Sequence, residues 1–289
     1  MGNLSKRNPL ADSARRRLIW RMAFDQLLLL AAIQGITEFI PVSSSGHLVL
    51  AHEWGGTGQA DALSSAVLDV ALHLGTLAAV MVYFRQDVVR LAMGALDVLR
   101  AKQTAPRQEA LNMVYATVPV LLAAALLLGL GLIDALRTPE TVAWASILFA
   151  VPLYLADRYG ASVKAVPDMA VRPALLMGLA QILALIPGAS RAGVTIMAGR
   201  ALGFSREAAA RYSMLMAMPV ILAFALFGLL DLWAAGNVAA LGTALLGALL
   251  AALFALASID IFLKLTRRLS LLPFVLYRVG LGAAILLVM

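Results

Sequence analysis

The chain has 289 residues, of which 62% are hydrophobic and 13% are charged, and its formal net charge is +7. Soluble domains are roughly 45–50% apolar and about 25% charged, so this composition excludes an ordinary water-soluble protein. The chain contains no cysteine, which excludes disulfides and thiolate metal sites. Its basic residues flank apolar runs, so membrane topology and anionic headgroups explain the positive charge better than nucleic-acid binding does.

Residues 1–22 form a basic tail in front of the first apolar run. Residues 1–21 contain six Lys or Arg and are followed by no cleavage pattern of small residues. We therefore interpret this segment as a juxtamembrane tail and not as a removed signal peptide. The remainder, 23–289, is predicted to be a single membrane domain.

The first apolar segment, about 24–53, is interrupted by a Pro/Ser-rich break that separates two helix-like runs. At membrane depth, broken backbone is tolerated only when it is buried in protein or lines a cavity. The segment is therefore predicted to form a re-entrant helix–loop–helix hairpin. The polar residues at its centre are Gln34, Glu38, Ser43, Ser44, Ser45 and His47.

Apolar runs long enough to cross a membrane follow along the chain. A spanning helix needs roughly 20 apolar residues to cross about 30 Å of hydrocarbon. Because lipid offers no partners to exposed backbone groups, we predict an all-α polytopic protein with about six transmembrane helices plus two re-entrant hairpins. Basic loops at 85–109 and 157–172 connect some of the spans. The predicted spans are 64–84, 110–133, 141–156, 212–232, 238–263 and 271–289.

A second broken segment, about 173–204, resembles the first. Three predicted spans separate the two segments, so the second hairpin should enter from the opposite face, as in an inverted repeat whose broken loops meet near the midplane. We place the first repeat at about 23–156 and the second at about 173–289. The matched positions are Gln34 with Gln181, Ile40-Pro41 with Ile186-Pro187, Ser44 with Ser190, and Gly46 with Gly193.

Two charged residues inside the hairpins point to function. Glu38 is costly in an apolar segment, and such residues are functional by default, although a structurally satisfied or interfacial carboxylate is the alternative. Arg191 lies between two apolar runs and offers a planar, permanently charged fork suited to phosphate. His47 is either a core histidine or is folded back onto Glu38.

The serines of the two breaks admit two interpretations. Small polar residues pack at helix interfaces in membranes, but hydroxyls and free amides at a helix N-terminus also make an anion site. Together with Glu38, His47 and Arg191 they supply an acid/base, candidate nucleophiles and a cation, which are the requirements of phosphoryl transfer. Because the chain shows no aqueous domain, a lipid-linked phosphate is the expected substrate.

At these residues the sequence resembles a known family. The stretches "QGITEFIPVSSSGHLVLAHEW" and "IPGASRAGVTIMAGRALGFSREAAARYSMLMAMPVI" are similar to the two signature regions of the bacterial undecaprenyl-diphosphate phosphatases, also called bacitracin-resistance proteins. The resemblance implies a multi-pass enzyme of the bacterial plasma (inner) membrane that converts undecaprenyl diphosphate to undecaprenyl phosphate and inorganic phosphate. This reaction recycles the lipid carrier for peptidoglycan synthesis and confers bacitracin resistance. The resemblance also implies a homodimer, an active site that faces the periplasm, and a divalent cation such as Mg²⁺ or Ca²⁺.

The resemblance further implies a role for each site residue. Some members have an E-x-x-x-E pair at the first signature, and here its first position is Gln34, which cannot act as a base and is a weaker cation ligand. Either Glu38 carries the acid/base work alone, or the metal relies on substrate oxygens; the metal ligands are not identified, and Glu38 is a possible one. The implied catalytic residues are Glu38, Ser44, His47 and Arg191, and the implied phosphate-binding residues are Gln34, Ser43, Ser45 and Ser190.

Several alternatives stay open at this point. Ser44, His47 or a water could attack the phosphorus. Broken helices in an inverted repeat are typical of secondary transporters, so a lipid flippase is the rival function, whereas a structural scaffold does not explain Glu38 and Arg191. The membrane orientation is also open, because the tail and loop 85–109 are both basic and yet are predicted on opposite faces.

Overall fold

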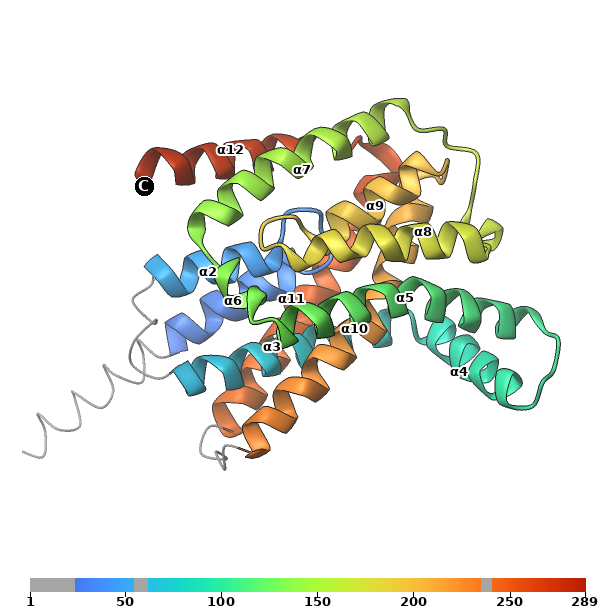
Figure 1. Ribbon diagram of the computed structural model, residues 1–289, viewed down its shortest axis with the longest axis horizontal. Helices are drawn as coiled ribbons and strands as arrows, with labels where there is room; N and C mark the ends of the chain where they lie inside the picture. Colours follow the sequence, from blue (N-terminus) through green and yellow to red (C-terminus); the bar gives the residue numbers. More distant parts are fainter. Residues whose placement is uncertain (1–23, 55–61, 235–240) are drawn as a thin grey trace, which may run out of the picture.

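The computed structural model describes residues 24–54, 62–234 and 241–289, so the predicted tail 1–22 lies outside the described residues. The described part is a bundle of helices (Figure 1), and its only β-type pairing is an isolated bridge between Lys164 and Phe204. In chain order the helices are Phe24–Thr37, α2 (Ser44–Trp54), α3 (Ala62–Tyr83), α4 (Arg85–Leu99), α5 (Ala105–Gly129), α6 (Leu132–Ala135), α7 (Pro139–Tyr159), η1 (Val166–Asp168), α8 (Val171–Gln181), η2 (Ile182–Leu185), α9 (Arg191–Ala201), α10 (Arg206–Ala234), α11 (Leu241–Arg268) and α12 (Leu272–Val288).

Four of the described helices are long and apolar enough to cross a membrane: α5, α7, most of α10 and most of α11. The pair α3 and α4 adds a fifth candidate only if it is counted as one span, although its two halves differ in direction by 90°. Helix α12 has 17 residues, which gives it a length of about 26 Å at 1.5 Å per residue. The chain is thus an all-α polytopic membrane protein, and the finer arrangement of six spans and two hairpins stays a prediction.

The interpretation of 85–109 as a loop is wrong for most of its length. Residues Arg85–Leu99 form helix α4, and α5 begins at Ala105, where Thr104 Oγ1 accepts a hydrogen bond from the Arg107 amide at 3.2 Å. Helix α4 forms because Val88 and Leu91 lie on one of its faces and pack against the core. The predicted loop 157–172 is confirmed only for its middle part, because α7 extends to Tyr159 and α8 begins at Val171, and residues 160–170 between them contain one short 3₁₀ turn.

Small residues allow the helices to approach closely, as is common in membrane proteins. A Cβ added to Gly75 of α3 would lie 2.1 Å from the Ala248 carbonyl oxygen of α11. A Cβ added to Gly178 of α8 would lie 2.5 Å from the Ala116 carbonyl oxygen of α5. Helices α7 and α12 lie side by side along one edge of the bundle (Figure 1).

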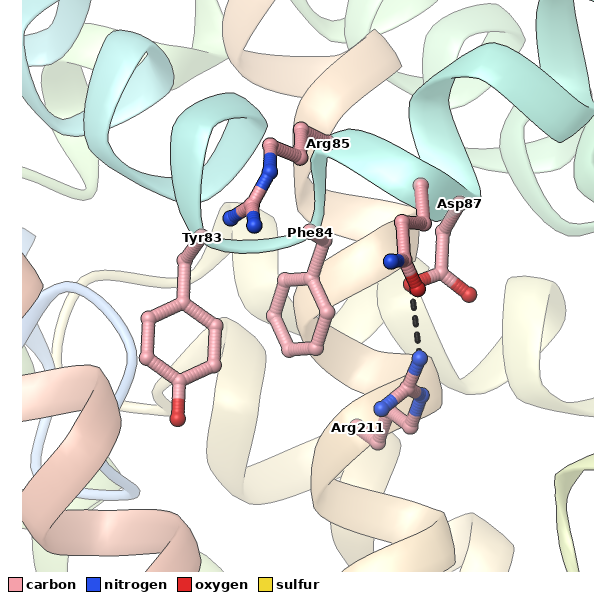
Figure 2. A pocket seen from close by; sticks show the side chains of 6 residues that line it. Tyr83, Phe84, Arg85, Asp87 and Arg211 are labelled. Atoms are coloured by element: carbon pink, nitrogen blue, oxygen red, sulfur yellow. Dashed lines mark hydrogen bonds and ion pairs between the residues drawn. The ribbon is translucent and has the colours of Figure 1, made fainter.

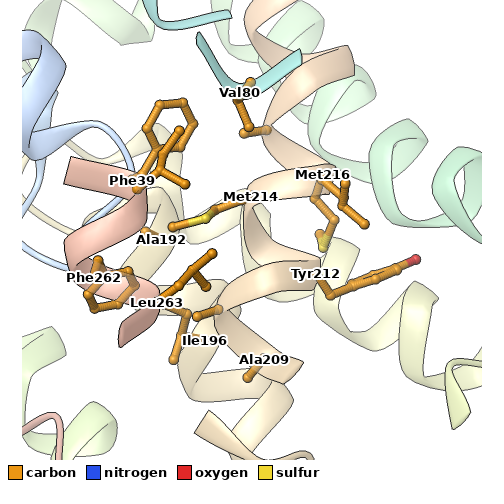
Figure 3. Packing of buried hydrophobic residues seen from close by; sticks show 14 of the residues in the cluster. Phe39, Val80, Ala192, Ile196, Ala209, Tyr212, Met214, Met216, Phe262 and Leu263 are labelled. Carbon is orange, nitrogen blue, oxygen red and sulfur yellow. The ribbon is translucent and has the colours of Figure 1, made fainter. Parts of the chain in front are cut away.

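The main apolar core includes a residue of the first break. Phe39 is fully buried, and around it lie residues of α3, α9, α10 and α11 (Figure 3). Because Phe39 follows Glu38 in the chain, this packing fixes the turn that carries the carboxylate.

Both predicted helix–break–helix segments are present. The first contains the helix Phe24–Thr37, a turn at 38–43 and α2; the second contains α8, η2, a turn at 186–190 and α9. We call these turns the first turn and the second turn. The two turns touch, because Ser43 Oγ of the first accepts a hydrogen bond from the Gly188 amide of the second at 3.2 Å. The structure thus brings together segments that lie about half a chain length apart.

Candidate active site

Each turn ends in a serine that caps the helix after it. Ser43 and Ser190 both have left-handed backbone, with φ of 78° and 70°, a conformation uncommon for residues other than glycine. Ser43 Oγ accepts a hydrogen bond from the Gly46 amide at 3.2 Å, and Ser190 Oγ accepts one from the Gly193 amide at 3.1 Å. Serine oxygens commonly satisfy the free amides of a helix N-terminus in this way.

This geometry corrects one detail of the sequence comparison. The structure makes Ser43, and not Ser44, the counterpart of Ser190. The reason is that the second turn is one residue longer between its proline and its capping serine, so an alignment on the Ile-Pro pairs displaces the serine by one position. The counterpart of Ser44 is Arg191, because each is the first residue of its helix.

These two first residues converge on one carboxylate. Ser44 Oγ donates to Glu38 Oε2 at 2.6 Å, and Gln34 Nε2 donates to the same oxygen at 3.0 Å. Arg191 Nη2 donates to Glu38 Oε1 at 3.1 Å. The exposed fractions of the Arg191 and Glu38 side chains are 12% and 7%, so the ion pair is largely removed from solvent. Four of the predicted site residues therefore form one hydrogen-bonded network.

The backbone holds the Arg191 guanidinium in place. Nη2 also donates to the Glu38 carbonyl oxygen at 3.0 Å, and Nη1 donates to the Ser213 carbonyl oxygen of α10 at 2.9 Å. The Phe39 ring centroid lies 5.7 Å from the guanidinium carbon. The cation is thus fixed between the first turn and α10, and a fixed cation stabilises negative charge better than a mobile one.

The structure does not bond His47 to Glu38. Its Nδ1 lies 2.6 Å from the Ser43 carbonyl oxygen, and its Nε2 lies 2.7 Å from the hydroxyl of Tyr277 in α12. The His47 ring also stacks on the Tyr277 ring. A carbonyl oxygen only accepts, so Nδ1 carries the proton in this contact. In the neutral ring, Nε2 then accepts from Tyr277, and neither nitrogen keeps a free lone pair.

The remaining predicted phosphate-binding residues occupy different positions. The Ser43 and Ser190 hydroxyls are buried and engaged as caps. Ser45 is exposed, and its hydroxyl lies 3.3 Å from that of Ser43. Gln34 is fully buried, and its Oε1 accepts no hydrogen bond. The network around Glu38 therefore includes one buried acceptor without a partner.

The sequence reasoning missed Arg278, which is fully buried in α12. Its guanidinium donates to the carbonyl oxygens of both turns, at 2.9 Å for Ala189, 3.0 Å for Gly188 and 3.4 Å for Pro41. It also donates to two carbonyl oxygens of α7. An arginine inside the apolar run 271–289 was the available signal, since an intramembrane charge is rare without a partner or a role.

The described residues do not fit a resident metal ion. They contain no group of three His, Cys, Asp or Glu side chains that could hold one. Both oxygens of Glu38 already accept hydrogen bonds, and the neighbouring Gln34 Oε1 accepts none. Divalent cations of the Mg²⁺ type bind proteins through one or two carboxylates when phosphate oxygens complete the shell.

Known proteins with similar sequences identify the family of this chain. The bacitracin resistance protein BacA family matches residues 27–284. A relative from Maricaulis maris, named undecaprenyl-diphosphatase, is 47% identical over 92% of this chain and 98% of its own length. Relatives of the same name from Ruegeria pomeroyi and Dinoroseobacter shibae are 42% and 43% identical, over 92% of this chain and at least 98% of theirs. The chain therefore belongs to the bacitracin resistance protein BacA family.

Proposed function

We propose that this protein hydrolyses undecaprenyl diphosphate to undecaprenyl phosphate and inorganic phosphate. The observation that carries the proposal is the network in which a hydroxyl and a guanidinium, at the N-termini of two helices, share one buried carboxylate. The names of its relatives support the same reaction. The activity recycles the lipid carrier for cell-wall synthesis and thereby gives bacitracin resistance.

The terminal phosphoryl group binds between the N-termini of α2 and α9. Both helix dipoles present their positive ends there, and such ends bind phosphate. Arg191 adds a permanent charge with a fork that matches two phosphate oxygens. A phosphate that takes these donors competes with Glu38 for the guanidinium, and so frees the carboxylate to act as a base.

Ser44 is the nucleophile in this mechanism. Its hydroxyl already donates to Glu38 Oε2 at 2.6 Å, so the carboxylate takes the proton as Oγ attacks the terminal phosphorus. The bond from phosphorus to the bridging oxygen breaks, and undecaprenyl phosphate leaves with that oxygen. Water then adds to the phosphoserine phosphorus, the Ser44 oxygen recovers the proton from Glu38, and inorganic phosphate is released.

His47 has a positioning role in this proposal. Both ring nitrogens are engaged, so attack by His47 would first break its contact with Ser43 or with Tyr277. The ring ties the first turn of α2 to α12 and so orients the neighbouring Ser44. Direct attack by water, with Glu38 as the base, differs from the Ser44 route in one observable, because it forms no phosphoserine.

We propose that a divalent cation enters the site bound to the substrate and is not held by the protein alone. With Glu38 as the carboxylate nearest the proposed phosphate, Mg²⁺ or Ca²⁺ would be held largely by diphosphate oxygens. We expect a chelator to lower phosphate release, added Mg²⁺ to restore it, and binding of the cation to the substrate-free protein to stay weak.

We propose a membrane orientation from the distribution of basic residues. The ends of α10, α7, α4 and α11 are joined by the ion pairs Arg206–Asp157, Arg211–Asp87 and Arg267–Glu207. The same helix ends also contain Arg85, Arg158 and Arg268, which make this end of the bundle basic. The positive-inside rule assigns this end to the cytoplasm of a plasma-membrane protein. The hairpin with α2 would then open to the periplasm. We also propose that the protein is a homodimer. Its molecular mass in detergent tests this.

A lipid flippase is the second candidate function. The contact between two broken helix segments favours it, because transporters bind their substrates at such places. A flippase would move undecaprenyl phosphate across a vesicle membrane and would leave undecaprenyl diphosphate unhydrolysed.

Phosphate release from undecaprenyl diphosphate by the detergent-purified protein separates these candidates. We expect release by the wild type, little by Glu38→Gln, and near wild-type release by Glu207→Gln, whose carboxylate is paired with Arg267 at the basic end. A well-folded wild type that releases no phosphate, with and without Mg²⁺, would overturn the proposal and favour the flippase.

A further inference from the structure

Helix α4 leaves α3 at 90°, so the two helices make one candidate span only if that span is sharply bent. Helix α4 has 15 residues, about 23 Å at 1.5 Å per residue, and it contains two Arg and two Asp. It is too short and too charged to cross a membrane of about 30 Å. If α3 crosses the membrane, a helix at right angles to it lies along the membrane surface.

One face of α4 is apolar and exposed. Val89, Met93, Leu96 and Leu99 are 56%, 46%, 49% and 83% exposed, and their spacing of three and four residues places them on one side of the helix. The opposite side contains Gly94, which packs against Pro106 of α5. We call the four exposed residues the α4 stripe.

Basic residues stand at both ends of the α4 stripe. Arg85 precedes it and Arg100 follows it, and helical spacing puts both on the same side as the stripe. Across 85–109 the chain has five basic and three acidic residues. Amphipathic helices with an apolar face and basic flanks lie in the membrane interface and are attracted to anionic lipid.

A cleft of about 190 Å³ lies at the elbow between α3 and α4. Figure 2 shows Arg85 and Arg211 on either side of the Phe84 ring, with Tyr83 and Asp87 at the edges. Arg211 is neutralised by Asp87 at 2.6 Å, whereas Arg85 has no carboxylate within ion-pair distance among the described residues. The cleft therefore offers one uncompensated guanidinium beside an aromatic ring, whereas the Tyr83 hydroxyl points away from Arg85 and donates to Asp260 Oδ1 at 3.3 Å.

We propose that this elbow is a binding site for an anionic phospholipid of the cytoplasmic leaflet. The headgroup phosphate binds Arg85 in the cleft, and the acyl chains cover the α4 stripe. The charge complementarity selects anionic over zwitterionic lipid, and the apolar stripe selects a lipid over free phosphate. The site is separate from the network around Glu38 and does not depend on the proposed reaction, whereas its assignment to the cytoplasmic leaflet rests on the orientation proposed above.

The test measures lipid binding to the purified full-length protein in detergent by native mass spectrometry and by thermal stability. We expect phosphatidylglycerol to bind and to raise the melting temperature, and phosphatidylcholine and inorganic phosphate to do neither. Arg85→Gln should weaken phosphatidylglycerol binding about fivefold, as expected for one basic side chain at an anionic surface. Lys102→Gln removes an exposed charge outside the cleft and serves as the matched control.

A second measurement tests where the α4 stripe lies. Because the chain has no cysteine, a spin label can be attached at Met93→Cys alone, with Lys102→Cys as the solvent control. In phosphatidylglycerol vesicles the Met93 label should be accessible to oxygen and protected from a water-soluble nickel reagent. Equal nickel accessibility at both positions would overturn the proposal. Equal phosphatidylglycerol binding by wild type and Arg85→Gln, or protection that depends on protein concentration as in a contact between two copies, would also overturn it.

Discussion

The two turns have the same backbone plan and different chemistry. In both, a serine with left-handed backbone caps the next helix through a glycine amide. The first helical residue then differs: α2 begins with Ser44 and α9 begins with Arg191. Each points at Glu38, so one turn contributes a hydroxyl and the other contributes a cation to the same carboxylate.

The difference shows how a repeated element can build an asymmetric site. The capping serines are needed twice because each helix N-terminus has free amides. The reacting groups are needed once each, because phosphoryl transfer needs one nucleophile and a cation opposite it. Substitutions at the first helical residues should therefore change turnover, whereas substitutions at the caps should change stability.

The largest effect is expected for Ser44→Ala. Loss of the nucleophile should lower turnover at least on the order of 10⁴-fold, as loss of a catalytic serine does in other hydrolases. Phosphate release measures the effect, and Ser270→Ala, which removes a hydroxyl between α11 and α12 outside the network around Glu38, is the matched control with turnover near that of the wild type. Similar losses in both variants would contradict the assignment of Ser44.

Arg191→Ala should lower turnover about 10²–10³-fold, which is the cost of removing one stabiliser of transition-state charge. Arg191→Lys should recover only part of this, because a point charge lacks the fork. The alanine variant also leaves Glu38 buried without its cation, so circular dichroism in detergent should accompany the assay. Wild-type turnover in a folded Arg191→Ala variant would refute the role.

Arg278→Met should act on the two turns together. The substitution leaves carbonyl oxygens of Gly188, Ala189 and Pro41 without a donor, and each buried unpaired acceptor costs roughly 1–3 kcal/mol. We expect a lower melting temperature, and a larger fall for Arg278→Met than for Ser43→Ala. An unchanged melting temperature would show that these contacts do not hold the turns together.

The smallest effects are expected for the caps. Ser190→Ala should lower the free energy of unfolding by about 1 kcal/mol, the usual cost of a lost helix cap. Ser43→Ala should cost more, because Ser43 Oγ also accepts from the Gly188 amide of the other turn. Thermal unfolding in detergent compares the two variants, and a greater loss for Ser190→Ala would reverse this ranking.

Much of this arrangement could be predicted from particular residues. The two breaks were visible because proline interrupts apolar runs, and Glu38 and Arg191 stood out because charge is costly there. Helix α4 was missed because its charges suggested a loop, whereas its packing depends on a few apolar residues that only the fold brings to the core. Arg278 and Tyr277 could not be placed, since no local pattern says that α12 lies against both turns.

Trapping the covalent intermediate distinguishes attack by Ser44 from attack by His47 or by water. The purified protein is mixed with undecaprenyl diphosphate that carries a radiolabel on the terminal phosphate, the reaction is stopped within one turnover, and peptides are analysed for bound label. We expect label on Ser44 in the wild type and none in Ser44→Ala. Label on His47, or full turnover by Ser44→Ala without any labelled peptide, would contradict this expectation.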